Sequence, residues 1–131
     1  MEFWQSEGVD VKGLYMNDGC GLSRWNSIST RQLTEMLRSI SKESYYKSFY
    51  NSLPVAGKSG SLGSLMKGTA AENNLHAKSG YITRVRSYAG YVNNKKGEPL
   101  VFSIIANNYD CTPADMRTKL EKLMILIAEL E

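Results

Sequence analysis

A lysine, a small hydroxyl residue and a glycine follow one another at Lys78–Gly80, directly after the extended run that begins at Asn74. Two apolar, strand-like segments follow at 85–92 and 99–106, so the triplet should lie on, or end, an edge strand of a small antiparallel sheet. A glycine there allows a ligand or another chain to approach the backbone closely. The ammonium and the hydroxyl would then face a cleft. The same triplet also fits an ordinary turn at the end of a strand, because so short a motif recurs by chance.

A second polar cluster occupies residues 18–26. Gly19 and Gly21 flank Cys20, and a serine and an asparagine, Ser23 and Asn26, follow within a few positions. Glycine, serine and asparagine favour turns and irregular backbone. The cluster is therefore predicted to be a loop with a polar tip.

Two amphipathic helices are expected between the polar clusters. Ser29 or Thr30 can cap the first helix, in which apolar residues recur at three- and four-residue steps. The second, shorter helix is predicted at 44–51. A glycine- and serine-rich loop through Gly63 follows, and one more helical turn is expected at 64–67. The apolar residues of the first helix are Leu33, Met36, Leu37 and Ile40.

Three strands and a final helix are predicted after this loop. The strands should span 75–79, 84–93 and 100–107, and a further strand-like segment lies near the start, at 13–16. Thr112 can cap the last helix, with Pro113 at its first position. The apolar stripe of this helix should cover one face of the sheet. The stripe comprises Met116, Leu120, Leu123, Met124, Ile127 and Leu130.

The expected fold class is α+β, with helices packed on a small antiparallel three-stranded sheet. Such a sheet leaves a strand edge open. The strand at 101–106 is too apolar for an ordinary free edge, and its pattern suggests burial on both sides. We therefore expect it to be covered by the N-terminal segment, by a second copy of the chain or by another part of a longer protein.

The length and amino-acid composition of the chain indicate which classes of protein it can belong to. The chain has 131 residues, which predicts one domain spanning 1–131, and its 42% hydrophobic and 22% charged residues are ordinary for a globular protein. A net charge of +3, evenly spread, argues against nucleic acid as a partner. Cys20, Cys111 and the single histidine His76 are too few for a zinc site or a disulfide framework, so no metal is expected.

Targeting signals are not apparent in the sequence. No apolar run reaches the roughly 18 residues that span a bilayer, and the first residues lack the pattern of a secretory signal peptide. Either the protein stays in the cytoplasm or this chain is a piece of a longer one.

Five blocks of the sequence resemble, in order, the C-terminal part of peptidase family S13. These are the D-alanyl-D-alanine carboxypeptidases and endopeptidases among the low-molecular-mass penicillin-binding proteins. The resemblance implies a β-lactamase/transpeptidase-like fold, of whose penicillin-binding domain this chain would be the C-terminal portion. It also implies serine-type acyl transfer on peptidoglycan stem peptides, β-lactams as ligands, no cofactor and an extracytoplasmic parent protein. The blocks are residues 18–24, 53–57, 77–80, 89–92 and 98–103.

The resemblance implies catalytic roles for three residues. Ser23 would help to pass a proton to the leaving amine, Asn26 would hold the substrate amide, and Lys78 would place positive charge near the substrate carboxylate. One departure affects the second of these roles. If the family spacing places the asparagine two positions after the serine, that position holds Trp25 here.

The resemblance also implies that residues 79–81 bind the substrate. Ser79 stands where threonine is usual, and its hydroxyl can donate to the substrate carboxylate. Gly80 would leave space for the ligand. The backbone N–H of Tyr81 would be one donor of the oxyanion hole.

The nucleophile motif Ser-x-x-Lys occurs at 39–42, 44–47 and 64–67, but no instance fits the family. The family nucleophile lies far upstream of the second motif, at the start of a buried helix. The chain is therefore expected to carry the substrate-binding side of an active site without the attacking serine, and to be inactive alone.

Two alternatives to an enzyme fragment remain open from the sequence. One is a non-catalytic module that binds peptidoglycan peptides. The other is a small interaction protein in which Ser23 and Lys78 are ordinary surface residues.

Overall fold

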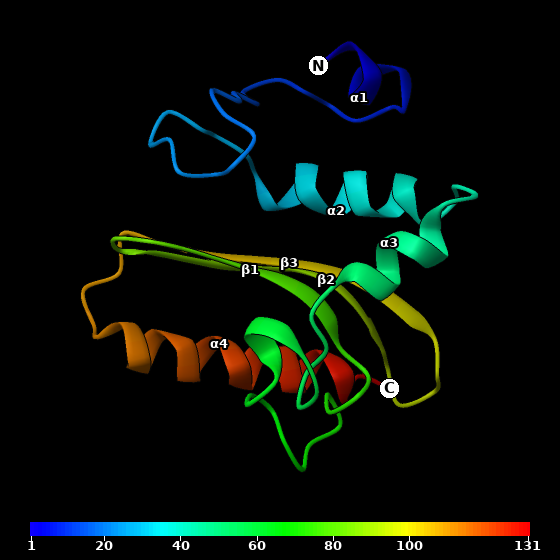
Figure 1. Ribbon diagram of the computed structural model, residues 1–131, viewed down its shortest axis with the longest axis vertical. Coiled ribbons are helices and arrows are strands. Elements are labelled where there is room, and N and C mark those ends of the chain that lie inside the picture. Colours follow the sequence, from blue (N-terminus) through cyan, green and yellow to red (C-terminus); the bar gives the residue numbers. More distant parts are fainter.

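The computed structural model describes residues 1–131 and stacks them in layers (Figure 1). The N-terminal segment lies over α2, the helices α2 and α3 lie over one face of the sheet, and α4 covers the other face. The helices are α1 (Glu2–Ser6), α2 (Thr30–Ile40), α3 (Tyr46–Ser52) and α4 (Pro113–Ala128), with a short 3₁₀ helix η1 (Gly60–Leu62). The strands are β1 (His76–Ile82), β2 (Val85–Asn93) and β3 (Pro99–Asn107).

The start of α2 confirms Ser29 as its cap and ties the helix to the N-terminal segment. The backbone N–H of Gln32 donates to Ser29 Oγ at 3.1 Å, and the backbone N–H of Ser29 donates to Gln32 Oε1 at 2.9 Å, which is a capping box. The buried Gln32 amide also donates to the carbonyls of Asp10, at 2.9 Å, and Lys12, at 3.1 Å. The Gln32 side chain therefore both completes the capping box of α2 and anchors the preceding loop.

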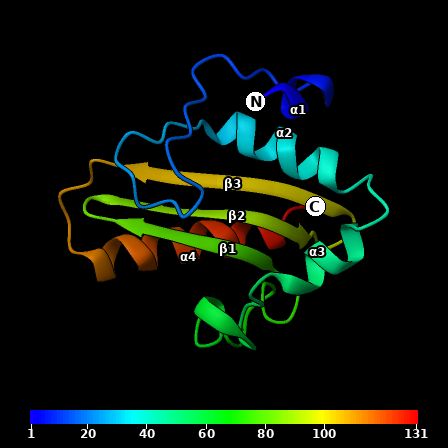
Figure 2. The same ribbon diagram turned by 45° about the horizontal axis from the view of Figure 1, so that its top comes forward.

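The sheet is antiparallel with the order β1-β2-β3, so β1 and β3 are both outer strands (Figure 2). His76 lies opposite Tyr91, and Val85 lies opposite Asn107. The predicted fold class, α+β with a small three-stranded sheet, is confirmed. β1 extends three residues beyond its predicted end because Gly80–Ile82 pair with Val85–Ser87 across the hairpin.

The main core lies between the sheet and α4. Leu120, Met124 and Ala128 of α4 are buried, and they pack against a sheet face that includes Tyr88 and Phe102. The predicted apolar stripe is only partly right. Leu123 and Leu130 of the predicted stripe are 47% and 52% exposed, and Leu126, outside that stripe, is 57% exposed, because residues four apart form the buried line and these three are rotated away from it. Together with Ile104 and Ile127 they line an outward-facing apolar groove.

Two other expectations were wrong. The segment at 13–16 forms no strand and makes only an isolated bridge between Tyr15 and Ser27. The helical turn expected at 64–67 is absent, because η1 ends at Leu62 and only turns and bends follow it. Met66 has a backbone φ of +59°, outside the helical region, which explains why no helix continues there.

The apolar strand β3 is less buried than its composition predicted. Phe102 is buried, whereas its neighbours along the strand, including Val101 and Ile104, are half-buried. The α4 face of β3 is covered by the main core, and the opposite face lies under α2 (Figure 1). The outer edge of β3 pairs with no strand. No helix of the protein combines the length and apolar character needed to cross a membrane.

Candidate functional site

Lys78 and Ser79 lie in the middle of β1 and point to opposite faces of the sheet, as adjacent residues of a strand do. The exposed Lys78 shares the α2 face with Ala89, its partner in register, and its Nζ donates to the Ser79 carbonyl at 2.7 Å. Ser79 shares the α4 face with Tyr88 and donates from Oγ to Ser61 Oγ at 2.9 Å. Both side chains are therefore held by weak, exposed hydrogen bonds that a ligand can replace.

The outer edge of β1 is covered only at its start. The Ala77 N–H donates to the Pro54 carbonyl at 3.0 Å, so this group points away from β2. Backbone groups alternate in direction along an antiparallel strand, which turns the N–H and C=O of Ser79 and Tyr81 toward the same outer edge. No further strand pairs there. The Tyr81 N–H is therefore directed toward any group that binds along β1.

Gly80 has a packing reason in addition to the predicted functional one. A Cβ atom at this position would lie 2.5 Å from Ser87 Oγ, on the neighbouring strand. A side chain would therefore force Ser87 to rotate.

The loop at 17–26 is organised by Asp18, a residue that the sequence analysis did not single out. Its carboxylate accepts from the backbone N–H groups of Gly21, at 2.8 Å, and Ser23, at 2.7 Å, and from Asn26 Nδ2 at 3.0 Å. The hydrogen bond from Asn26, followed by those from the loop backbone, lowers the pKa of Asp18 below its ordinary value. The signal that could have identified this residue is an aspartate preceding a glycine-rich turn.

Asn26 has a structural role in this loop. Its Oδ1 accepts from the backbone N–H groups of Asn17, at 2.7 Å, and Asp18, at 3.3 Å, while its Nδ2 donates to Asp18. Its carboxamide is thus engaged within the loop rather than presented to a ligand. Ser23 Oγ accepts from the Trp25 N–H at 3.2 Å, and its own hydroxyl hydrogen has no acceptor in the protein.

A cavity of about 670 Å³ lies where this loop meets the β1–β2 hairpin. The loop contributes Leu22 and Arg24, and the hairpin contributes Tyr81, Ile82, Thr83 and Arg84. Ser23 and Lys78 are not among these residues. The structure therefore brings the loop to the hairpin end of β1, at Tyr81, rather than to Lys78.

The cavity is cationic, since two of its six lining residues are arginines and none is acidic. A third arginine, Arg86, lies over the Tyr81 ring, with its guanidinium carbon 4.8 Å from the ring centroid. Guanidinium groups suit planar anions such as carboxylates. The sequence alone assigned no role to Arg24 or Arg84. Only the tertiary contact between loop and hairpin places the two in one cavity.

No nucleophile is apparent among the three Ser-x-x-Lys segments. Ser39 lies at the C-terminal end of α2 and donates to Glu7 Oε2 at 2.6 Å. Ser44 and Ser64 lie in turns and are exposed. None of the three therefore starts a buried helix. No group of three or more histidine, cysteine, aspartate or glutamate side chains is arranged to hold a metal ion.

Comparison with known proteins identifies the family to which this chain is similar. A model of the D-Ala-D-Ala carboxypeptidase 3 (S13) family matches residues 2–130. A D-alanyl-D-alanine carboxypeptidase of Actinomadura sp. strain R39 is 38% identical over 127 residues, which are 93% of this chain and 23% of the relative. The chain therefore spans about a quarter of the length of the relatives that it matches.

Solved structures are similar over almost the whole chain. Penicillin-binding protein 4 of Haemophilus influenzae superposes with a TM-score of 0.85 at 23% identity, covering 98% of this chain and 30% of that one. The same protein complexed with a β-lactam gives a TM-score of 0.78 at 24% identity, with coverage of 95% and 30%. At this level of identity the likeness establishes the fold, and it confirms the expected transpeptidase-like architecture.

Proposed function

The chain belongs to the D-Ala-D-Ala carboxypeptidase 3 (S13) family, and on that premise we propose that it is the C-terminal portion of a serine-type D-alanyl-D-alanine carboxypeptidase domain. In this domain it supplies one wall of the cleft that binds peptidoglycan stem peptides. Because that substrate is part of the cell wall, the parent protein acts outside the cytoplasm.

The open outer edge of β1 is the observation that carries this proposal. An extended peptide can add to such an edge as a further strand, with main-chain hydrogen bonds to the outward groups of Ser79 and Tyr81. The Ser79 hydroxyl leaves Ser61 and donates to the terminal carboxylate of the peptide, while the Lys78 ammonium, which lies beside the outward Ser79 carbonyl, places its positive charge near that carboxylate from the other side of the strand edge. The Tyr81 N–H stabilises the oxyanion, an interaction whose loss typically raises the barrier by about 2.7–4 kcal/mol.

The arginine-lined cavity at the end of β1 extends this site. Arg24 and Arg84 line it, and none of the other four lining residues is acidic, so it attracts a second anionic group of the same substrate. A stem peptide with a side-chain carboxylate fits this arrangement, and so does a β-lactam that mimics it. We therefore assign substrate recognition to the outer edge of β1 and the turn that follows it, from Lys78 to Arg84.

Ser23 and Asn26 receive different roles in this proposal. The free hydroxyl hydrogen of Ser23 leaves it able to take part in the proton transfer that the family resemblance implies. Asn26 acts through the loop, because its carboxamide holds Asn17 and Asp18 and thereby positions Arg24. The attacking serine comes from outside residues 1–131, since none of the three Ser-x-x-Lys segments has suitable surroundings.

Two apolar surfaces support the proposal that this chain packs against further protein. The outer edge of β3 is unpaired, and the nearby groove exposes Leu123, Leu126 and Leu130. An exposed apolar edge strand favours pairing with another strand. We propose that the remaining part of the same domain, or a second copy of the chain, pairs with β3 around residues 100–106.

Equilibrium binding and covalent labelling test the function together. The 131-residue chain should bind an acyl-D-Ala-D-Ala peptide saturably, and Lys78→Ala should weaken that binding about tenfold or more, because it removes a charge-assisted interaction. Lys122→Ala, on the exposed face of α4, is the matched control and should bind normally. Fluorescent penicillin should leave the chain unlabelled.

Two results would contradict the proposal. Covalent labelling by penicillin would show that the chain contains its own nucleophile. Absence of peptide binding, or equal binding by the Lys78 and Lys122 variants, would show that the β1 edge is not the peptide site.

A further inference from the structure

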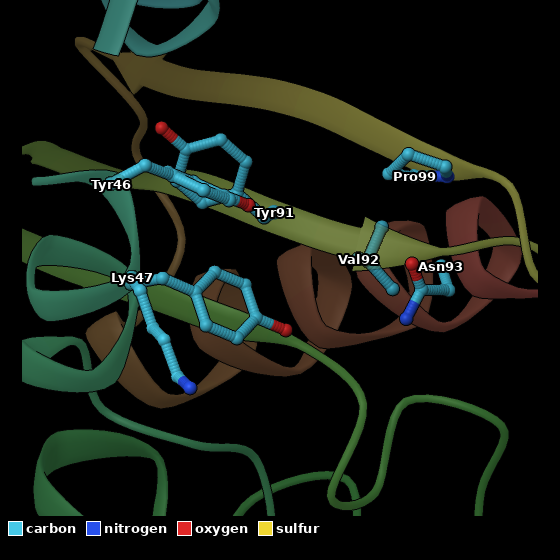
Figure 3. Close-up of a pocket in the computed structure, with 7 residues that line it drawn as sticks. Tyr46, Lys47, Tyr91, Val92, Asn93 and Pro99 are labelled. Atoms are coloured by element: carbon cyan, nitrogen blue, oxygen red, sulfur yellow. The ribbon is translucent and has the colours of Figure 1, made fainter. Parts of the chain in front are cut away.

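A second cavity, of about 420 Å³, opens between α3 and the adjoining ends of β2 and β3 (Figure 3). Three tyrosine rings form most of its apolar wall, and Figure 3 shows Lys47 and Asn93 on either side of them. We call it the tyrosine pocket. Its lining residues are Tyr46, Lys47, Tyr50, Tyr91, Val92, Asn93 and Pro99.

The tyrosine rings hold one another in place. Tyr46 packs edge-on to Tyr91, with ring centroids 5.3 Å apart, and Tyr50 lies 5.8 Å from Tyr91 in a tilted arrangement. Tyr50 also stacks on the imidazole of His76, with centroids 3.9 Å apart. Aromatic pairs at these distances are mutually attractive. The wall is therefore formed before any ligand arrives, which lowers the entropic cost of binding.

Several polar groups of the tyrosine pocket have no partner in the protein. The exposed Lys47 makes no salt bridge, and the carboxamide of Asn93 makes no hydrogen bond, although the Asn93 backbone is bonded to Asn74. The hydroxyls of Tyr46 and Tyr50 donate to no protein group. Burial raises the pKa of both phenols, so they remain protonated donors at neutral pH. An apolar aromatic wall with a few free donors suits a ring that has a C–H face and oxygen acceptors.

The tyrosine pocket opens on the same sheet face as Lys78. Tyr91 lies opposite His76, and His76 precedes Lys78 by two residues. The side chains of Tyr91 and Lys78 therefore lie on one face of the sheet, about 6.6 Å apart along the strand direction. The arginine-lined cavity lies at the other end of β1. An elongated ligand on β1 can therefore contact the tyrosine pocket as well as the peptide site.

We propose that the tyrosine pocket binds an N-acetyl amino sugar, with the C–H face of the sugar ring against Tyr46 and Tyr50. The Lys47 ammonium and the Asn93 carboxamide donate to the acetamido carbonyl and the hydroxyl oxygens. The choice of sugar rests on the proposed function, because peptidoglycan stem peptides are attached to a glycan of N-acetyl amino sugars. The cell-wall substrate is then recognised through both its peptide and its glycan.

Titration of the 131-residue chain with chitotetraose tests the proposal, with cellotetraose as the comparison ligand. Cellotetraose offers similar ring faces but has no acetamido group. Chitotetraose should bind saturably and at least about tenfold more tightly than cellotetraose. Tyr50→Ala should reduce chitotetraose affinity about tenfold through loss of the stacking face. Tyr45→Ala, which removes an exposed tyrosine outside the pocket, should leave the affinity unchanged.

Lys47→Gln keeps the test decisive if Tyr50→Ala disturbs the fold, because Lys47 is exposed and its replacement leaves the core intact. It should weaken chitotetraose binding several-fold, whereas Lys122→Gln should not. Equal affinity for the two sugars, or unchanged affinity in both pocket variants, would overturn the proposal. Peptide binding that depends on Lys78 is a separate readout, so a failure of the sugar site can be distinguished from a failure of the proposed function.

Discussion

The hydroxyl of Tyr91 donates a buried 2.7 Å hydrogen bond to the backbone carbonyl of Leu37, which ties β2 to α2. Burial raises the pKa of this phenol far above its ordinary value, so the hydroxyl remains a donor throughout the neutral range. The Leu37 carbonyl also accepts the helical hydrogen bond of Ser41, at 3.0 Å, and so keeps one partner if the tyrosine is changed. The bond thereby fixes Tyr91, a residue of the tyrosine pocket, against α2.

Tyr91→Phe should therefore lower the free energy of unfolding by about 0.5–1.5 kcal/mol, the usual contribution of one hydrogen bond. Urea denaturation gives the value directly. Tyr45→Phe removes an exposed hydroxyl and should change the stability by less than about 0.5 kcal/mol. Equal stability of both variants and the wild type would show that the Tyr91 bond does not hold the layers together.

Gly90→Ala should disrupt the pairing of β1 with β2. A Cβ atom at Gly90 would overlap the backbone carbonyl oxygen of His76 and lie 2.6 Å from Ala77 Cα, and neither backbone atom can move without breaking the register. We expect a loss of about 3 kcal/mol or more in unfolding free energy. Gly80→Ala is the matched comparison and should cost less, because the obstructing atom is the rotatable Ser87 Oγ. An equal loss of unfolding free energy in Gly90→Ala and Gly80→Ala would contradict this prediction.

The loop at 17–26 should lose its order in acid. The hydrogen bond from Asn26 holds the pKa of Asp18 below its ordinary value of 3.8. Because the folded pKa is the lower one, the stabilisation is complete above 3.8 and declines as the pH falls through the folded value. Fluorescence of Trp25 in a Trp4→Phe background should report the transition. In Asp18→Asn the loop should already be altered at neutral pH. If this variant kept the same acid transition as the wild type, the transition would arise from a titratable group other than Asp18.

His76 should make the sheet less stable below neutral pH. Burial against Tyr50 lowers the pKa of this imidazole below its ordinary value of 6.5. The unfolded chain then binds a proton between 6.5 and the folded pKa, so stability is unaffected above 6.5 and falls as the pH drops through this interval. His76 is the only histidine, so its NMR titration is unambiguous. Thermal melts of His76→Gln should lack this part of the pH dependence, and a wild-type titration above 6.5 would contradict the prediction.

The exposed leucines of α4 should promote self-association of the isolated chain. Leu123, Leu126 and Leu130 lie together with Ile104 in an apolar groove near the unpaired edge of β3. Replacing Leu123 and Leu126 with glutamine should make sedimentation more monomeric at high concentration, with little loss of stability because both side chains are about half exposed. A wild-type chain that is monomeric at high concentration would argue against this surface as an interface.

The sequence alone was sufficient for features that depend on neighbouring residues. Ser29 or Thr30 was expected to cap one helix and Thr112 another, because capping is decided within one turn, and the structure has Ser29 and Thr112 as the caps. The three strands were found from their apolar runs and turn residues. The family membership also came from the order of the residues, among them the block at 77–80.

Only the tertiary structure decided how the candidate site is assembled. The carboxamide of Asn26 stabilises its own loop. Arg24 and Arg84, which are 60 positions apart in the sequence, line the same cavity. The tyrosine pocket likewise combines residues of α3, β2 and β3. Local sequence patterns constrain backbone conformation over a few residues, whereas contacts between distant segments depend on how layers pack. For that reason the residues of β1 could be predicted, while their partners across the cleft could not.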